Sequence, residues 1–171
     1  MSEQQQDDQA QGGGQAGAQP QGNQPVFSIE KLYVKDLSVE VPGAPQIYQQ
    51  REAPQVEVSM NNSGKPVSDG YYEVVINLTV TAKIKDKTVF LVEVAYGGVF
   101  QVRNVPEAEI DMVMGVTCPN ILFPYLREVV SETVSRAGFP PVILAPMNFE
   151  AIYKARQQEG AKQAASGTTT H

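Results

Sequence analysis

The sequence predicts an α+β domain in which a four-stranded antiparallel sheet carries helices on one of its faces. Two observations indicate this fold. The first half of the chain alternates apolar and polar residues, whereas the second half repeats apolar residues at intervals of three and four. Strands that come together in sequence and are followed by helices are typical of an antiparallel sheet with its helices on one side. With 171 residues, of which 42% are hydrophobic, the chain suffices for one domain with a core.

Both ends of the chain are poor in large apolar residues. Residues 1–25 are rich in Gln, Gly and Ala, and such a segment cannot bury enough surface to offset the entropy of ordering, so we expect a disordered extension. We expect a disordered tail over 159–171 for the same reason, which leaves 26–158 as the folded domain. The extension has no basic region followed by an apolar run, so we do not expect a signal peptide.

The clearest strand signal covers 72–84, where apolar and polar residues alternate. Residues 85–87 have the composition of a turn, so 88–102 is the expected partner strand of a hairpin. Gly97 and Gly98 predict a bulge or bend within that partner strand, because glycine weakens a strand interior.

Two further strands are expected before this hairpin. Residues 27–41 form a long first strand whose apolar residues change phase near Leu32, which predicts a bend or a different pairing at its two ends. A long connection over 42–54 leads to a short strand over 55–60. The sequence Asn61-Asn-Ser-Gly64 then predicts a turn, because these residue types favour turn conformations.

The second half of the chain predicts helices. After Pro106, acidic residues precede apolar residues at helical spacing, which suits the positive end of a helix dipole. A second helix carries a broad apolar stripe and stops near Gly138, and Pro124 lies either at its start or at a kink inside it. Asn148 is positioned to cap a last helix.

Residues that could support catalysis are scarce. The only histidine is His171, at the end of the predicted tail, and the only cysteine is Cys118, between apolar segments. Because a nucleophile and its base must lie within hydrogen-bonding reach, we interpret Cys118 as a buried structural thiol. No Cys/His cluster has zinc-ligand spacing, and no glycine-rich loop resembles a phosphate loop. We therefore expect a binding protein without cofactor or metal rather than an enzyme.

The chain is acidic, with a net charge of −6 and a pI near 4.8. Negative charge repels nucleic acid and anionic membrane surfaces and favours basic segments of other proteins. No stretch approaches the roughly 18 apolar residues of a transmembrane helix.

Apolar residues occupy both faces of the strand over 88–102, so both faces should be covered. A subunit contact and ordinary helix packing account for that pattern equally well.

The segment Cys118-Pro-Asn-Ile-Leu-Phe-Pro-Tyr125 resembles the signature of the SecB protein-export chaperones. Shorter matches stand in the family's order on both sides of it, from Tyr33-Val-Lys-Asp36 to Leu144-Ala-Pro-Met-Asn-Phe149. The resemblance covers about residues 27–153, which is nearly the whole predicted domain.

The resemblance implies a homotetramer, built as a dimer of dimers, in the bacterial cytosol. SecB-like proteins bind unfolded precursor proteins, consume no nucleotide and deliver their clients to the SecA motor. In the family, SecA binds an acidic patch on the exposed face of the sheet, which matches Asp36, Glu40, Leu91 and Glu93 here. The period of two along a strand supports this assignment, because Leu91 and Glu93 share one face of their strand and Asp36 and Glu40 share one face of theirs.

Two more sets of residues follow from the resemblance. The positions that join dimers in the family match Val92, Val94 and Tyr96. The client groove, between the first connection and the helices, matches Ile47, Tyr48, Val58, Met60, Met114, Ile121 and Phe123. The chain departs from the family at Glu52, where many relatives carry tryptophan, so the aromatic part of the groove is expected to be weaker.

Three classes of function therefore stand side by side. The leading hypothesis is an ATP-independent chaperone for export clients. The alternative is a SecB-like antitoxin or solitary chaperone that serves a different partner, which a neighbouring toxin gene would favour. A small-molecule enzyme would require a closed pocket with convergent polar groups, and the sequence offers none.

Overall fold

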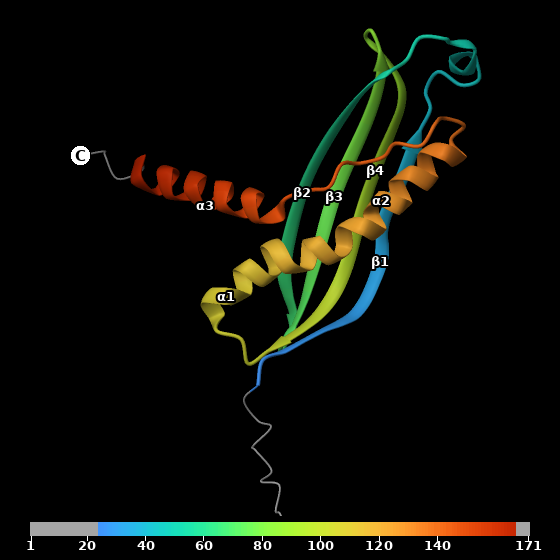
Figure 1. The fold of residues 1–171 in the computed structure, drawn as a ribbon. Helices are drawn as coiled ribbons and strands as arrows, with labels where there is room; N and C mark the ends of the chain where they lie inside the picture. The colour runs from blue at the N-terminus through green and yellow to red at the C-terminus, as the bar shows by residue number, and fades with distance from the viewer. Residues whose placement is uncertain (1–23, 167–171) are drawn as a thin grey trace, which may run out of the picture.

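The computed structural model describes residues 24–166 and contains one antiparallel sheet with strand order β1-β4-β3-β2. The strands are β1 (Val26–Glu40), β2 (Gln55–Ser68), β3 (Tyr71–Ile84) and β4 (Lys87–Arg103). Helix α2 (Cys118–Arg136) runs along one side of the curved sheet, and the other side carries no helix among the described residues (Figure 1). The α+β fold predicted from the sequence, with four antiparallel strands and helices on one face, is confirmed.

The central hairpin follows the sequence pattern closely. Strands β3 and β4 pair from Tyr71↔Gln101 to Ile84↔Lys87, and the turn between them lies at Lys85 and Asp86. Lys85 adopts a φ of 54°, in the left-handed region that tight turns require. The prediction of a hairpin over these residues is therefore correct.

The turn predicted at Asn61–Gly64 is wrong, because β2 continues through it. Asn61 lies opposite Asn77 within the strand pair. The Asn77 side-chain amide donates a hydrogen bond of 3.1 Å to the side-chain oxygen of Asn61 across the strands. Gly64 lies opposite Val74 and makes room for the Met114 side chain, whose Sδ would lie 2.9 Å from an added Cβ. Tertiary partners thus override the turn preference of these residue types. The chain turns instead at Gly70, which has a φ of 70°.

The change of phase in the first strand has a structural cause. Strand β1 pairs with β4 through two register shifts, between Ile29 and Lys31 and between Val34 and Asp36. Each shift leaves one extra residue on β1, which exchanges the two faces of the strand beyond it. The bend or altered pairing predicted near Leu32 is confirmed as these bulges.

Of the two alternatives predicted at Gly97 and Gly98, a bulge or a bend, the bulge is wrong, since β4 pairs regularly there with both neighbours. The two glycines serve close packing instead. A Cβ on Gly97 would lie 2.9 Å from Cζ of Tyr33, and one on Gly98 would lie 2.8 Å from Cδ2 of Leu122. The lack of a side chain at each position lets a neighbouring group lie directly on the strand.

Helices follow the sheet in the predicted half of the chain. They are α1 (Glu107–Met112), a π-helical turn η3 (Val113–Thr117), α2, and α3 (Phe149–Ser166). A short 3-10 turn, η2 (Gln46–Gln49), lies earlier, in the connection between β1 and β2. Pro124 lies inside α2 rather than at its start. Since proline has no N–H, it leaves one carbonyl of the preceding turn without its helical partner. Asn148 caps α3, because its side-chain oxygen accepts a hydrogen bond of 2.9 Å from the Ala151 N–H.

The predicted C-terminal tail begins too early, because α3 continues beyond residue 159 to Ser166. Its distal half is charged and small-residue rich, so the composition that suggested a tail is also compatible with an exposed helix. Most of the predicted N-terminal extension, residues 1–23, and the last part of the tail, 167–171, lie outside the described residues. Between residues 24 and 166, no helix is both long and apolar enough to cross a membrane.

The core lies between α2 and the sheet. Side chains on β3 and β4 pack against the buried face of α2, which includes Leu122, Leu126 and Val130. Cys118 is fully buried there, and burial raises the pKa of its thiol to about 12. A thiol that stays protonated is a poor nucleophile, in agreement with its interpretation as a structural group.

Candidate functional site: an apolar groove and the open face of the sheet

The sheet has two faces with different partners. We call the side covered by α2 the helix face and the opposite side the open face. Register assigns the rows: Val92 of β4, Val80 of β3 and Val58 of β2 lie in one row on the helix face. Because α2 covers mainly β3 and β4, the helix face of β2 is left beside the helix rather than under it.

An apolar groove of about 1000 Å³ occupies this uncovered part of the helix face. Its floor is formed by β2 and the neighbouring part of β3. One wall is the connection that contains η2, and the other is the segment 139–147 between α2 and α3, which crosses the sheet (Figure 1). Its lining includes Ile47, Val56, Val58, Met60, Leu78, Phe90, Phe123, Phe139, Val142, Ile143, Leu144 and Met147.

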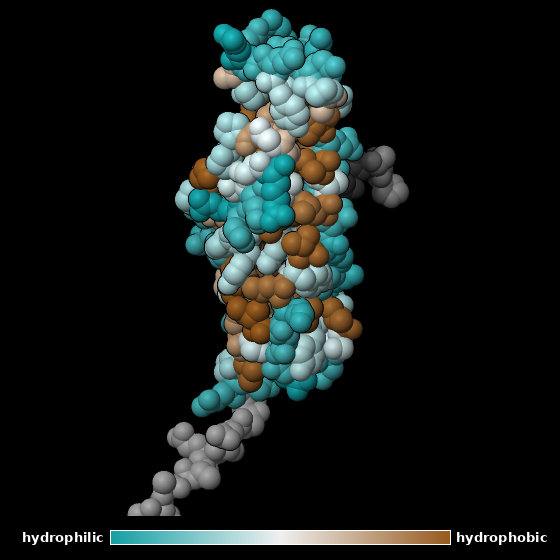
Figure 2. Space-filling model, turned by 90° about the vertical axis from the view of Figure 1, so that its right-hand side faces the viewer, coloured by the Kyte–Doolittle hydropathy of each residue, from teal (hydrophilic) through white to brown (hydrophobic). Residues whose placement is uncertain are grey.

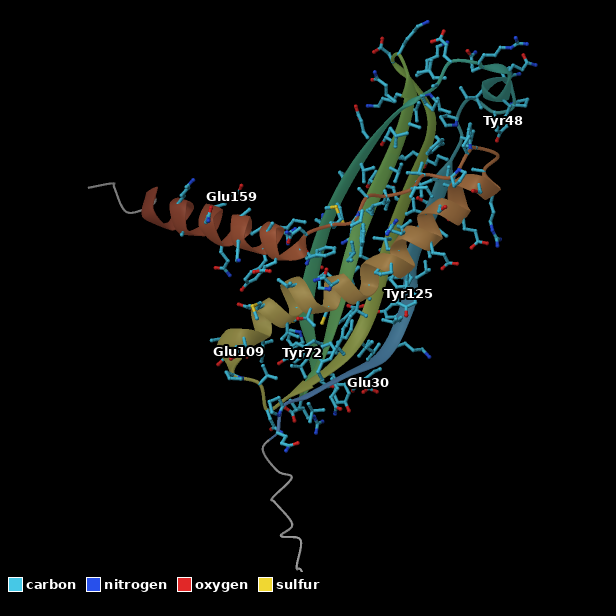
Figure 3. The ribbon with its side chains drawn as sticks, in the orientation of Figure 1. Glu30, Tyr48, Tyr72, Glu109, Tyr125 and Glu159 are labelled. Carbon is cyan, nitrogen blue, oxygen red and sulfur yellow. The ribbon has the colours of Figure 1, made fainter. Side chains whose placement is uncertain are left out.

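Four of the seven residues predicted for client binding line this groove: Ile47, Val58, Met60 and Phe123. Tyr48 lies in η2, within the connection between β1 and β2 (Figure 3), and its ring packs on that of Phe139 with 5.4 Å between centroids. Its hydroxyl donates a hydrogen bond of 2.9 Å to the carbonyl oxygen of Ala137, so Tyr48 holds the wall in place.

The other two predicted residues lie elsewhere. Met114 lines a smaller and more polar hollow of about 530 Å³ next to α3, together with Tyr153 and Arg156. Ile121 packs against the core and does not line either hollow. Both lie on the helical run that crosses the sheet, and sequence spacing alone could not tell which side of that run faces the groove.

Sequence reasoning missed the segment 139–147 as a groove wall. The predicted stop of the second helix near Gly138 left the residues after it without a role, although the apolar residues that follow Pro140 and Pro141 were a usable signal. Ile143 is 70% exposed, a large value for an isoleucine, and it lines the groove. Two prolines hold this segment extended, so that apolar side chains can project from it without a helix or sheet of its own.

The chemistry of the groove is that of a binding surface. Glu52 is the single charged residue in its lining, at the mouth, where its carboxylate pairs with Lys85 Nζ at 3.3 Å. This is the position at which the resemblance led us to expect an aromatic residue, and a charged pair stands there instead. Between residues 24 and 166, no cluster of three His, Cys, Asp or Glu side chains could hold a metal ion. An open apolar site of this kind suits a ligand with apolar groups.

The open face brings together the four residues predicted for SecA binding. On adjacent strands, Glu40 lies opposite Leu91, and Ser38 lies opposite Glu93. Asp36 lies two residues before Ser38 on β1, opposite Ala95. Asp36, Glu40 and Glu93 are exposed and Leu91 is half-buried. The four side chains therefore form one acidic surface around an apolar residue.

The residues predicted to join subunits belong to the core of the single chain. Val92, Val94 and Tyr96 are 0%, 2% and 7% exposed beneath α2. The ring of Tyr96 stacks on that of Tyr125 of α2, with centroids 6.2 Å apart. In the single chain these side chains contact their own helix, and their role in joining subunits stays a prediction.

Exposed apolar residues lie instead along the helix face of edge strand β1. Their exposed fractions range from 42% to 48%, and they are Phe27, Ile29, Val34, Leu37 and Val39. Tyr125, 47% exposed, points from α2 toward this strand (Figure 3). Figure 2, which views this side of the molecule, shows hydrophobic residues gathered in a broken vertical band. We call these six residues the β1 stripe.

The chain matches known proteins over most of its length. The family model described as "Preprotein translocase subunit SecB" matches residues 20–160. The "Protein-export protein SecB" of Methylobacillus flagellatus is 62% identical, with 92% of this chain and 98% of that protein covered. The protein of the same name from Nitrosospira multiformis is also 62% identical, over 85% of this chain and 91% of that protein.

A solved structure shares the fold. It is the Mycobacterium tuberculosis Rv1957 SecB-like chaperone, in complex with a ChAD peptide from the Rv1956 HigA1 antitoxin. The TM-score is 0.60 at 16% sequence identity, and the similarity covers 71% of this chain and 90% of that one. At this identity the likeness concerns the fold.

Proposed function

This chain belongs to the SecB family, and we propose that it is a chaperone for protein export that binds unfolded precursor proteins in its apolar groove. It works without ATP and without catalysis, in the bacterial cytosol. The observation that carries the proposal is the groove of about 1000 Å³, whose lining is almost entirely uncharged and partly exposed to solvent. An unfolded chain offers what such a groove can bind, namely extended apolar segments.

Apolar burial is the source of affinity in this proposal. Each large apolar client side chain that leaves water contributes about 1.5–3 kcal/mol. The entropy lost when the client becomes ordered offsets much of this gain. Met60 and Met147 in the lining are flexible and adapt to side chains of different shape. The result is broad selectivity with moderate affinity at each site, as a chaperone of many clients requires.

The acidic surface of the open face is the proposed docking site for the SecA motor. Asp36, Glu40 and Glu93 supply negative charge for a basic segment of the motor, and Leu91 supplies an apolar contact at the centre. This surface and the groove lie on opposite faces of the sheet, so a client and the motor can bind at the same time.

The β1 stripe supports the proposed homotetramer, a dimer of dimers. An exposed edge strand with apolar side chains is a template for pairing with another chain. Val92, Val94 and Tyr96 take part only by setting where α2 lies above the sheet. The charge of −6 on each chain keeps an assembly with open apolar grooves in solution. Light scattering should give a mass near four chains.

A refolding assay tests the chaperone function. The purified protein, in excess over a slow-folding precursor and without ATP, should delay refolding of the precursor. Unchanged refolding at excess protein would contradict the proposal.

For docking, Asp36→Ala, Glu40→Ala or Glu93→Ala should each weaken SecA binding, most strongly at low salt, while client binding stays intact. Equal loss of both activities would indicate a folding defect instead.

The alternative is a SecB-like chaperone that serves an antitoxin or another dedicated partner. The solved neighbour with an antitoxin peptide carries the same fold, which makes this function compatible with the architecture. The refolding assay separates the two, because a dedicated chaperone should bind one partner tightly and leave an unrelated precursor free to fold.

A further inference from the structure

Glu73 is a buried carboxylate on the open face of the sheet. It lies on β3 in a row of the open face, opposite Val99 of β4 and Lys65 of β2, yet it is only 7% exposed. Burial of an ionised carboxylate is unfavourable unless charge partners and hydrogen bonds compensate. The groups that cover Glu73 must therefore be identified.

Three side chains from the two edge strands surround this carboxylate. The Tyr33 hydroxyl donates a hydrogen bond to Oε1, and Lys35 Nζ lies 2.7 Å from the same oxygen. Lys65 Nζ lies 3.2 Å from Oε2. We call these four residues the Glu73 cluster. It links β1 to β2 across the whole width of the sheet. Lys35 and Tyr33 lower the pKa of Glu73 to about 2, so the carboxylate is ionised at neutral pH.

Gly97 makes the link across β4 possible. Tyr33 of β1 lies opposite Gly97, and Gly97 lies opposite Val75 of β3. Because a Cβ on Gly97 would lie 2.9 Å from Cζ of Tyr33, only glycine leaves room for the phenol ring to cross the strand. The motif Gly97-Gly98, which the groove and the acidic surface do not use, thus has a role in this cluster.

Lys35 is the extra residue of the second bulge in β1. Val34 lies opposite Tyr96 and Asp36 lies opposite Ala95, so Lys35 has no opposite residue on β4. A shift of one residue in a strand moves every following side chain to the other face. Without this bulge, Asp36 and Glu40 would lie on the helix face, while Leu37 and Val39 would lie on the open face.

We propose that Glu73 is a positioning residue for the acidic surface: through Lys35 and Tyr33 it holds the second bulge of β1 and so keeps Asp36 and Glu40 beside Leu91 and Glu93. This proposal rests on the proposed docking of SecA to that surface. Glu73 itself is buried and does not contact the partner. It acts through the register of β1.

The variant Lys35→Met gives a test in which the sign of the effect decides. Removal of a lysine makes the open face more negative, so simple attraction predicts tighter binding of a basic partner. The positioning role predicts weaker binding, because the bulge loses its ion pair with Glu73. We expect SecA affinity to fall about tenfold for Lys35→Met, measured by titration calorimetry at low salt.

Lys83→Met is the matched control. Lys83 lies on the same face, pairs with Glu57 at 3.0 Å, and its side chain is 41% exposed, against 42% for Lys35. It lies on β3, away from the β1 bulge. Its replacement should leave SecA affinity unchanged or slightly increased. If Lys35→Met behaves like Lys83→Met, the positioning role is wrong.

A second pair of variants covers the case in which Lys35→Met alters folding. Glu73→Gln should weaken SecA binding and accelerate hydrogen exchange of the β1 amides from residue 33 to 40, whereas Glu57→Gln should change neither. Client binding in the groove should persist in both. Normal exchange of these amides in Glu73→Gln would overturn the inference. Asp36→Ala reports on docking itself: if it leaves SecA affinity unchanged, the proposed docking surface is wrong, and the positioning role fails with it.

Discussion

One row of four valines crosses the helix face of the sheet, and its two middle members differ sharply from its two ends. Val92 and Val80, on β4 and β3, are 0% exposed beneath α2, whereas Val39 on β1 and Val58 on β2 are 45% and 48% exposed. Residue type and face are identical along the row. Only the cover differs, since one helix is narrower than four strands.

The two uncovered ends of this row have different neighbours. Val58 lies on the groove floor, opposite the segment 139–147, so a site for a small or extended ligand remains between them. Val39 belongs to the exposed β1 stripe and does not line the groove. The same apolar face thus provides a buried core, an open groove and an exposed stripe, according to what covers it.

The largest effect should come from the buried middle of the row. Val80→Ala should lower the free energy of unfolding by about 2–3 kcal/mol, because it removes two methyl groups and leaves a cavity beneath α2. Val58→Ala should change it by less than about 0.5 kcal/mol. Urea denaturation measures both. Equal losses would mean that α2 or a bound partner covers β2 in solution.

The exposed end on β2 should govern client binding instead. Val58→Asp places a charge on the groove floor and should weaken binding of an unfolded client by at least about tenfold, with little change in stability. Val67→Asp is the control, since Val67 lies on the same strand, is 58% exposed and does not line the groove. Calorimetric titration with a permanently unfolded client measures the two affinities. A similar loss in both variants would show that general charge repulsion, not the groove, controls binding.

The Glu73 cluster shows that the open face also has a buried region, and acid should reveal it. The pKa of Glu73 is lowered from an ordinary value of 4.5 to about 2, chiefly by Lys35 and then by Tyr33. Its stabilising contribution is therefore complete above pH 4.5 and is lost as the pH falls toward 2. Because the Lys35 and Lys65 side chains are 42% and 68% exposed, solvent screens both ion pairs, and we expect a loss on the order of 1 kcal/mol.

This pH dependence can be isolated by comparison of two variants. Thermal unfolding of Glu73→Gln should depend less on pH between 4.5 and 2 than that of the unmodified chain, while Glu57→Gln should retain the full dependence. Parallel curves for all three proteins would place the acid sensitivity in other carboxylates.

The smallest expected effect concerns α3, whose first turn closes one end of the groove through Ile152. Asn148→Ala removes the cap on this helix and should cost about 1 kcal/mol of local stability. Hydrogen exchange of the first-turn amides should accelerate, while the global free energy of unfolding changes little. If the client dissociates faster from Asn148→Ala than from the unmodified chain, α3 helps to retain the client. Slower dissociation from the variant would contradict a role of α3 in closing the groove.

Local pattern predicted most of the fold. The alternation over 72–84 placed β3, the phase change near Leu32 anticipated the bulges of β1, and Asn148 marked the start of α3. The errors share a cause. The turn expected at Asn61–Gly64 and the bulge expected at Gly97 were inferred from residue type, but at both places the glycine accommodates a side chain from a distant element, Met114 or Tyr33. No local signal contains that information.

The sequence by itself determined which residues share a strand face, and it thereby grouped Leu91 with Glu93 and Asp36 with Glu40. It also determined the family, through the segment from Cys118 to Tyr125. Only the tertiary structure decided that β1 adds residues at two bulges, that α2 buries Val92, Val94 and Tyr96, and that the helix face of β2 stays open beside the segment 139–147. The physical reason is that periodicity is a property of one strand, whereas cover depends on the width and path of elements that pack across several strands.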